Sequence, residues 1–351
     1  MGKKKSSLLK KVIIAILLIL LIAVGVGGYF AYKSIYQPNV NLDDKKSQII
    51  FIPTGSTFED VKLILNKNHL LKNTASFEFL SKKKKYINAV KPGKYRILAN
   101  MNNNSLINLL RAGIQEPVEI NFNGLHTVNE LIGRVGRRIE ADSLSLYRAI
   151  HDNGYLKKYG FTIDNVQALF IPNTYQFFWN TSIDQFFDRM AKEYKTFWTG
   201  SRKGKANTIG FSQTEVATLA SIVQAEQCCD FEEKKIIAGL YMNRLKKNMR
   251  LESDPTVIYA VGDFRIQRVL NGHKQVKSPY NTYLNTGLPP GPVNFVQQSS
   301  IDAVLDHEEN DFIFMCAKED LLGRHYFSKT YAQHQICARK YHDALNNRGI
   351  H

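Results

Sequence analysis

From Val12 to Tyr32 the chain contains no charged residue, and the core of this run consists almost entirely of Ile, Leu, Val and Ala. A helix of this length spans about 31 Å at ~1.5 Å per residue, which matches the hydrocarbon thickness of a bilayer. Lysines at positions 3, 4, 5, 10 and 11 precede the run, so the positive-inside rule places residues 1–11 in the cytoplasm. The sequence therefore predicts a single-pass protein of the cell inner (cytoplasmic) membrane, with everything after Tyr32 on the extracytoplasmic, periplasmic side.

A cleaved signal peptide is the alternative interpretation of this run. Such peptides usually carry an apolar region of about 7–15 residues with a small-x-small cleavage site close behind. Small residues are present at Ala23, Gly25, Gly27 and Gly28, which leaves cleavage open. The length of the run favours a retained transmembrane helix over residues 12–32, and no cysteine lies nearby to carry a lipid anchor.

The charge of the chain constrains its partners. The formal net charge is +16 at pH 7, and only five of the lysines lie in residues 1–11, so the predicted exported part is itself basic. A basic domain held at a membrane attracts anionic lipid headgroups or a polyanionic wall polymer. The predicted topology removes this domain from the cytoplasm, so we expect no nucleic acid partner. The run Lys82–Lys85 is expected to be a solvated surface patch.

The four cysteines do not form a metal-binding pattern. Cys228 and Cys229 are adjacent, whereas Cys316 and Cys337 lie far along the chain without paired spacing. We therefore predict no metal site, and nothing in the sequence indicates an organic cofactor. An exported protein can hold disulfides, and the sequence leaves both disulfides and free buried thiols open.

Two folded parts are predicted after the membrane run. Residues 33–47 are polar and are predicted to form a tether. Residues 48–115 show strand signals at 48–53 and 91–97, with helix signals at 58–65 and 75–81 between them and a further helix at 105–111. This strand–helix–helix–strand order resembles a LysM-type glycan-binding module.

Residues 117–347 are predicted to form a larger, mixed α+β domain. A strand is expected at 118–122 and helices at 143–157 and 182–197, while the polar segment 200–208 is predicted to be a loop. Within this domain we expect the helix that carries Glu226 to pack against a mixed sheet. Loops at 250–260 and 280–294 are expected to form a cleft beside it.

Glu226 stands where a helix calls for an apolar residue. A capping-box pattern at Ser212–Glu215 starts the helix, and Val216, Leu219 and Val223 mark an apolar stripe whose next position is Glu226. Carboxylates rarely enter a core unpaired, because desolvation penalises the charged form. Glu226 is therefore either solvated or paired with an Arg at the helix end, or it lines a partly apolar cleft as a general acid with a raised pKa.

The segments that follow favour the second interpretation. They combine amide, hydroxyl and aromatic groups on loops rich in Pro and Gly, a mixture that suits sugar recognition, although irregular structural loops have the same composition. The residues predicted to bind substrate are Asn243, Arg244, Asp254, Thr256, Tyr259, Tyr280, Asn281, Tyr283 and Pro290.

An ordered series of motifs over most of the predicted exported part resembles the YceG-like family of endolytic murein transglycosylases. The motifs are Leu219–Glu226, Asn243–Leu245, Met249–Leu251, Asp254–Val257, and Tyr280–Tyr283 with Gly287–Gly291. The resemblance implies a lyase with one essential Glu, matching Glu226, that protonates the glycosidic oxygen between MurNAc and GlcNAc. The MurNAc C6 hydroxyl then attacks C1 and leaves a 1,6-anhydro end.

The resemblance also implies where the reaction takes place. It points to newly made, uncrosslinked peptidoglycan strands at the outer face of the cytoplasmic membrane, with peptidoglycan synthases as possible partners. A single acid suffices because an internal hydroxyl replaces water, whereas ordinary glycosidases use two carboxylates.

The chain departs from the family pattern at several positions. Gln224 stands where members commonly carry a second acid, Asn173 where many have Asp, and Glu252 where Gln is common. If Glu252 faced the cleft it could activate water, which keeps a muramidase-type hydrolase as the alternative. A non-catalytic wall-binding protein that recruits glycan synthases is the third interpretation. His325 is expected to be structural.

Overall fold

The structure is a computed structural model that describes residues 3–347, so residues 1–2 of the predicted cytoplasmic tail lie outside the described residues. Backbone contacts divide the described chain into two compact units. The smaller unit holds residues 3–118 with 177–180, and the larger holds residues 119–176 with 181–347. Each unit is described separately.

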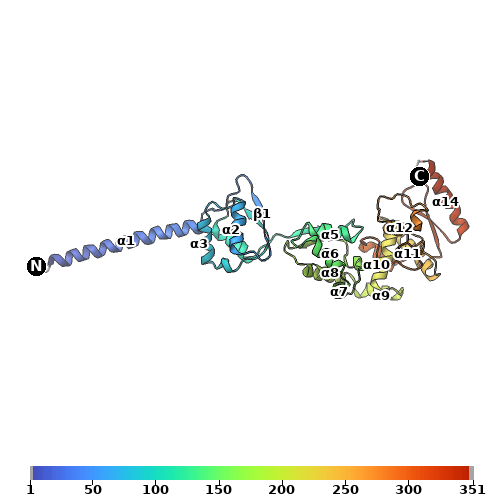
Figure 1. Ribbon diagram of the computed structural model, residues 1–351, viewed down its shortest axis with the longest axis horizontal. Helices are drawn as coiled ribbons and strands as arrows, with labels where there is room; N and C mark the ends of the chain where they lie inside the picture. Colours follow the sequence, from blue (N-terminus) through green and yellow to red (C-terminus); the bar gives the residue numbers. More distant parts are fainter. Residues whose placement is uncertain (1–2, 348–351) are drawn as a thin grey trace. The chain divides into compact units, whose positions relative to one another are not determined.

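The chain begins with one long helix, α1 (Lys3–Tyr36), drawn in blue in Figure 1. Within Leu9–Tyr36 the most apolar stretch has a mean hydropathy of 2.9 and is not buried against the rest of the described chain, whereas Ile35 near the end of the helix packs against the core of the smaller unit. The helix continues a few residues past the predicted end at Tyr32 and is long and apolar enough to cross a membrane.

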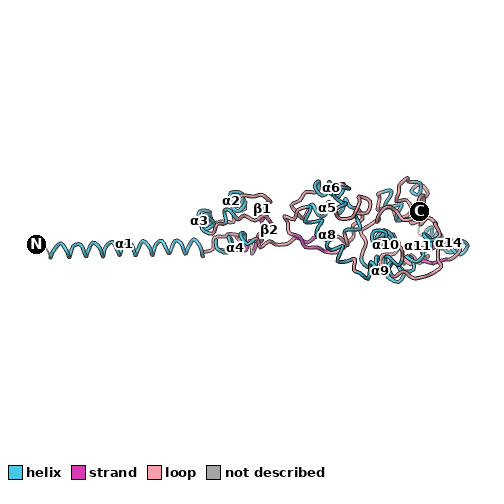
Figure 2. The backbone as a smooth tube through the Cα atoms, turned by 90° about the horizontal axis from the view of Figure 1, so that it is seen from below, coloured by secondary structure: helices cyan, strands magenta, loops and turns pink. Residues whose placement is uncertain are grey.

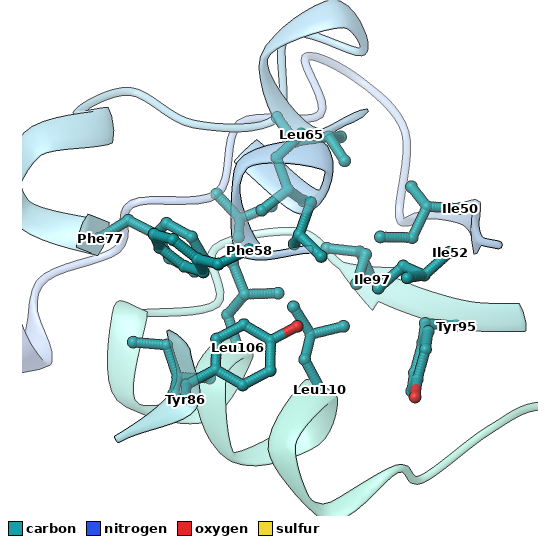
Figure 3. Close-up of a cluster of buried hydrophobic side chains, with 14 of the residues drawn as sticks. Ile50, Ile52, Phe58, Leu65, Phe77, Tyr86, Tyr95, Ile97, Leu106 and Leu110 are labelled. Atoms are coloured by element: carbon teal, nitrogen blue, oxygen red, sulfur yellow. The ribbon is translucent and has the colours of Figure 1, made fainter. Parts of the chain in front are cut away.

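The smaller unit confirms the predicted order of strands and helices. Its elements are β1 (Ser47–Ile52), α2 (Phe58–Lys67), α3 (Thr74–Lys83), the short 3₁₀ helix η1 (Tyr86–Asn88), β2 (Gly93–Leu98) and α4 (Asn103–Ala112). Strands β1 and β2 pair antiparallel, with Ser47 opposite Leu98. Figure 3 shows the core, in which side chains from both strands meet Phe58, Phe77 and Leu106 from the helices. The likeness to a LysM module stays a prediction.

The prediction of a polar tether at residues 33–47 is wrong for its middle part. Val40 and Leu42 are buried in the core of the smaller unit, and Val40 forms a β-bridge with Leu71. The buried Asn39 side chain donates to Asn103 Oδ1 at 2.7 Å. The polar composition of the segment hid two apolar side chains whose burial depends on partners distant in sequence.

The larger unit is mostly helical, as Figure 2 shows by the few short strands among its helices. It opens with β3 (Val118–Asn121), α5 (Val128–Gly136), α6 (Ser143–Ile150), α7 (Asn153–Lys157), η2 (Val166–Leu169), β4 (Thr174–Phe177) and α8 (Ile183–Phe197). It continues with α9 (Gly200–Thr208), α10 (Gln213–Glu226), α11 (Phe231–Lys246), α12 (Asp254–Val261), η3 (His273–Gln275), α13 (Gln298–Leu305), β5 (Phe314–Ala317), β6 (His325–Ser328) and α14 (Tyr331–Asn347).

Three structural expectations for this unit are wrong, and two of them concern the surroundings of Glu226. The strands of the described chain form three two-stranded sheets, and α10 packs among α9, α11, α12 and α13 rather than on a mixed sheet. Most of the predicted loop at 250–260 is helix α12. Short strands and short helices carry similar apolar patterns, so periodicity alone could not separate them.

The segment 200–208 is helix α9 and not a loop. Thr199 caps it by accepting a hydrogen bond from the Arg202 backbone N–H. The Arg202 guanidinium makes two hydrogen bonds to Asp302 of α13, at 2.8 and 2.9 Å. A helix held largely by capping and charge pairs has little apolar periodicity, which explains why the sequence did not reveal it.

Candidate active site

Helix α10 places Glu226 at its last residue. The predicted capping box is confirmed, because the Ser212 side chain accepts from the Glu215 backbone and the Glu215 side chain accepts from the Ser212 backbone. Every residue from 216 to 223 is buried, so this helix is covered on all sides rather than along one stripe. Glu226 itself is half-buried.

Two hydroxyl groups hold the Glu226 carboxyl. Ser253 Oγ donates to Glu226 Oε1 at 2.6 Å, and Tyr241 Oη donates to the same oxygen at 2.9 Å. Tyr241 lies on α11, and Ser253 immediately precedes α12. Among the described residues no hydrogen bond reaches Oε2, so this second oxygen is free to carry a proton toward a ligand.

The surroundings of Glu226 favour its protonated form. Burial raises the pKa of the Glu226 carboxyl, while the hydrogen bonds from Ser253 and Tyr241 and the charge of His325 oppose that rise. The nearby carboxylate of Asp254 adds to the rise. The position at a helix C-terminus acts in the same direction, because the helix dipole disfavours negative charge there. The net effect is a raised pKa, which suits a group that gives up a proton near neutral pH.

The side chain of Ser253 binds Glu226 and does not cap the helix that follows it. Ser253 occupies the N-cap position of α12 but makes no side-chain capping bond, because its hydroxyl is directed to Glu226. Its backbone N–H donates to Thr282 Oγ1 at 3.0 Å, and its carbonyl accepts from Thr256 Oγ1 at 2.7 Å. The hydroxyls of Thr256 and Thr282 are themselves 2.8 Å apart. Thr256, predicted to bind substrate, is therefore a buried residue that positions Ser253.

Three other predicted binding residues make structural contacts. The Asn243 amide donates to the Asn310 and Phe312 carbonyls at 2.7 and 3.1 Å. The buried Asn281 amide donates to the carbonyls of Lys274 and Val276. The buried Arg244 donates to the Leu251 carbonyl at 2.6 Å and to Glu252 at 2.9 Å. The Asn243 bonds join segments that are distant in sequence, whereas the Arg244 and Asn281 bonds hold neighbouring turns of the chain.

The remaining predicted binding residues are half-buried or exposed and stay candidates for ligand contact. Tyr283 Oη donates to Asp254 Oδ1 at 2.7 Å, beside Glu226. The rings of Tyr259 and Tyr280 lie 4.8 Å apart, and Tyr280 Oη donates to the Asp164 carbonyl. Pro290 is exposed.

Sequence reasoning missed Tyr241 and Ser253, which hold the candidate acid. Ser253 lies inside the segment that was singled out, but its neighbours Glu252 and Asp254 carry the more conspicuous charges. Tyr241 is on a buried helix, and the usable signal is that a buried tyrosine hydroxyl needs a hydrogen-bond partner.

The cysteines that the sequence left open are resolved in the structure. Cys228 and Cys229, just after Glu226, form a disulfide between neighbours, whereas Cys316 and Cys337 are free.

His325, which was expected to be structural, is held by Glu233. Glu233 Oε1 lies 2.8 Å from both the His325 backbone nitrogen and Nδ1.

The Glu252 carboxylate forms an ion pair with Arg244. The carboxylate accepts from the Arg244 guanidinium at 2.9 Å, and the Glu252 backbone has a positive φ of 51°. Glu252 Oε2 is therefore turned toward Arg244, which weakens the case for Glu252 as a base that activates water.

Gln224 holds the segment that leads into α13. Its amide nitrogen donates to Asn294 Oδ1 at 3.1 Å and to the Phe295 carbonyl at 3.0 Å. Its amide oxygen accepts from the Gln297 backbone at 2.7 Å and from Ser300 Oγ at 3.1 Å. The Gln224 side chain thus uses both its donor and its acceptor atoms at this position.

Gln224→Glu is expected to lower the free energy of unfolding by about 1–3 kcal/mol at neutral pH. The carboxylate would face the two acceptor oxygens that Gln224 now satisfies. This contact raises the pKa of the introduced Glu, so the loss should be small at acidic pH and grow as pH rises. Urea unfolding at several pH values measures it, with the exposed Gln298→Glu as matched control. Equal stability of both variants would contradict the role assigned to Gln224.

Known proteins resemble the chain over most of its length. A sequence model of the YceG-like family matches residues 50–340. An endolytic murein transglycosylase from Bacillus subtilis (strain 168) is 29% identical over 341 residues, which cover 92% of each chain. One from Streptococcus pneumoniae (strain ATCC BAA-255 / R6) is 26% identical, and the match covers 90% of this chain but 62% of that relative. A 2.6 Å crystal structure of a yceG-like protein from Listeria monocytogenes aligns with a TM-score of 0.55 and 26% identity, covering 84% of this chain and 99% of that one.

Proposed function

Because this chain belongs to the YceG-like family, we propose that it is an endolytic murein transglycosylase that uses Glu226 as its single acid and base. The curated relatives that carry this activity by name match over most of the chain. The observation that carries the proposal is the Glu226 carboxyl, which has a raised pKa, two donors on Oε1 and a free Oε2.

The first step is proton donation. In the protonated acid, the hydrogen bonds from Ser253 and Tyr241 favour Oε1 as the carbonyl oxygen, so the proton resides on Oε2. Oε2 gives this proton to the glycosidic oxygen between MurNAc and GlcNAc as the bond from that oxygen to MurNAc C1 breaks. The two donors then stabilise the carboxylate that forms, because hydrogen bonds to a charged group are stronger than those to a neutral one.

The second step regenerates the acid. The C6 hydroxyl of the same MurNAc attacks C1, and its proton passes to Glu226 Oε2. The products are a 1,6-anhydroMurNAc end and a free GlcNAc hydroxyl, with no water consumed. A single carboxyl suffices for this sequence, which agrees with the pairing of Glu252 to Arg244.

The proposed substrate contacts are the half-buried and exposed candidates Asp254, Tyr259, Tyr280, Tyr283 and Pro290. The polar groups of Asn243, Arg244, Thr256 and Asn281 make the internal contacts described above, so we assign these residues to positioning the site.

The apolar helix α1 supports a membrane location for this reaction. We propose that α1 anchors the enzyme in the cytoplasmic membrane, with its N-terminus inside and the part of the chain after α1 outside. The enzyme would then act on nascent, uncrosslinked strands at the outer membrane face, within reach of peptidoglycan synthases. Residues 48–115 would contribute glycan binding in the manner of a LysM module.

The function is tested by mass analysis of the products that the full chain, in detergent, forms from uncrosslinked glycan strands. Internal cleavage that leaves 1,6-anhydro ends is the expected result. Ordinary reducing ends, each heavier by one water, would replace the lyase with a hydrolase. Strands that bind without any cleavage would support the non-catalytic scaffold.

Ser253→Ala and Tyr241→Phe each remove one donor to the Glu226 carboxylate. The donors stabilise the charged form, so their loss raises the pKa of Glu226 further, and the limb of the kcat profile that falls at high pH should move to higher pH. We expect kcat at the optimum to fall by about tenfold for each variant, the value of one hydrogen bond to a charged group. A limb that stays in place or moves to lower pH would contradict this arrangement.

A further inference from the structure

Two hollows in the larger unit share one aromatic side chain. The first has a volume of about 360 Å³ and is lined by Ala225, Pro255 and Ile258, among others. The second has a volume of about 600 Å³ and is lined by Asn129 and Tyr259, among others. Phe264 lines both, so the two hollows are neighbours that meet at this ring. Each volume lies in the range of about 300–1,000 Å³ that is usual for small-molecule sites.

The lining of the first hollow includes chain neighbours of the proposed acid, although Glu226 itself does not line it. Ala225, in its lining, directly precedes Glu226 at the end of α10. Pro255, also in its lining, lies in the first turn of α12, two residues after the Ser253 that holds Glu226 Oε1. The hollow therefore adjoins the C-terminal end of α10 and the first turn of α12, the two places in the chain next to the reacting carboxyl and its donor.

A wall of rings runs from this hollow into the next. The Phe264 ring stacks on the imidazole of His126, with centroids 4.8 Å apart and planes 26° apart. Phe264 also meets Tyr259 edge-on at 6.4 Å, and Tyr259 contacts Tyr280 at 4.8 Å. Flat aromatic faces pack well against the apolar C–H faces of sugar rings.

Backbone hydrogen bonds hold His126 in place. The His126 carbonyl accepts from the Gln167 amide at 3.1 Å, and the His126 backbone N–H donates to the Glu130 carboxylate at 3.0 Å. His126 and Asn129 are exposed, so an imidazole and a carboxamide are available at the rim for hydroxyl and acetamido groups.

The charges select the kind of ligand. The lining of the first hollow contains no Asp, Glu, Lys or Arg, and Glu130 is the one such side chain in the lining of the second. Neutral sugar rings therefore fit the hollows better than a phosphate or the charged peptide that MurNAc carries, because a buried charge needs a partner. Rings, amides and the absence of ion-pairing groups together match N-acetylated sugars.

We propose that the two hollows bind consecutive N-acetylated sugars of the glycan strand, on one side of the bond that Glu226 protonates, with Phe264 and His126 as stacking residues. The inference rests on the proposed function. It assigns to Phe264 and His126 a part in holding the strand and none in the chemistry.

The test measures binding separately from cleavage. Calorimetry of uncrosslinked glycan fragments with the full chain carrying Glu226→Gln is compared with the same chain carrying Phe264→Ala in addition. We expect Kd to rise by about tenfold, the loss of one aromatic contact. In the active enzyme, Phe264→Ala should raise KM by about the same factor and change kcat by less than about twofold. Phe264→Tyr, which keeps the ring, should restore both values.

Two further variants keep the result interpretable. Tyr331→Ala removes an exposed ring from α14, which lines neither hollow, and should leave KM unchanged. If Phe264→Ala unfolds, as thermal melting would show, the exposed His126→Ala replaces it with the same expected rise in Kd.

The inference and the proposed function fail in different ways. If wild type makes anhydro ends that depend on Glu226 while Kd and KM are unchanged by Phe264→Ala and His126→Ala, the sugar-binding assignment is overturned and the function stands. If Glu226→Gln still cleaves, the proposed function is overturned. A Kd for glycan that still rises in Phe264→Ala would then support the hollows alone.

Discussion

Glu226→Gln is expected to lower kcat by about 10²–10⁴-fold, the usual contribution of a positioned acid and base. Glutamine has the same shape, and its amide oxygen can accept the hydrogen bonds that Ser253 and Tyr241 now give to Oε1. The amide nitrogen would replace protonated Oε2 but could not transfer a proton. Glycan binding should therefore survive, and calorimetry together with counting of anhydro ends would separate the two effects.

Glu252→Gln is the matched control for this substitution. It removes the Glu252 carboxylate, which is paired with Arg244. Glu252 lies two residues before Asp254 in the sequence. We expect kcat to change by less than about threefold, as for a partly exposed ion pair, and the products to keep their anhydro ends. A loss as large as that of Glu226→Gln would revive the hydrolase with Glu252 as its base.

The stability of Glu226→Gln provides a second readout. Because the folded-state pKa of Glu226 is raised, its contribution to stability is fully present below the unfolded pKa and is lost as pH rises through the folded pKa. The glutamine variant lacks this titration. Its stability relative to wild type should therefore increase from acidic to neutral pH. A difference that shrinks with rising pH would contradict the burial argument.

Phe170→Ala is expected to lower the free energy of unfolding by about 3–5 kcal/mol, the cost of removing a fully buried phenylalanine. Phe170 is 1% exposed, and its ring lies about 6 Å from those of Phe122, Phe186, Phe187 and Phe295. Phe295 in turn lines the first hollow. The substitution should lower Tm by about 10 °C or more and weaken glycan binding with it.

Phe231→Ala is the control for this core substitution. Phe231 begins α11 in the same unit and is 39% exposed, so we expect a loss below about 1 kcal/mol. Thermal and urea unfolding of the two variants measure the contrast. Equal losses would show that the rings around Phe170 do not form the core of the larger unit.

The sequence by itself determined the features that depend on local pattern and chemical type. The apolar run at residues 12–32 predicts a helix whatever the rest of the chain does, because a run of this length without charge can form few other structures. The capping box at Ser212 and the stripe that ends on Glu226 placed the one conspicuous carboxylate on a helix end. The order of strands and helices in residues 48–115 followed in the same way, because caps and periodicity act over a few residues.

Only the tertiary structure decided how the Glu226 carboxyl is held. Tyr241 and Ser253 lie 15 and 27 residues from Glu226 along the chain. A local sequence pattern does not show which residues at such separations come into contact. The same limit applies to the buried Val40 and Leu42 in the segment predicted to be a tether, and to helix α9, which charge pairs help to hold. It also applies to Thr256 and Asn281, which are buried and hydrogen-bonded within the chain. Hydrogen bonds and burial depend on which segments meet, and that is settled by packing of the whole unit rather than by the order of residues within any one segment.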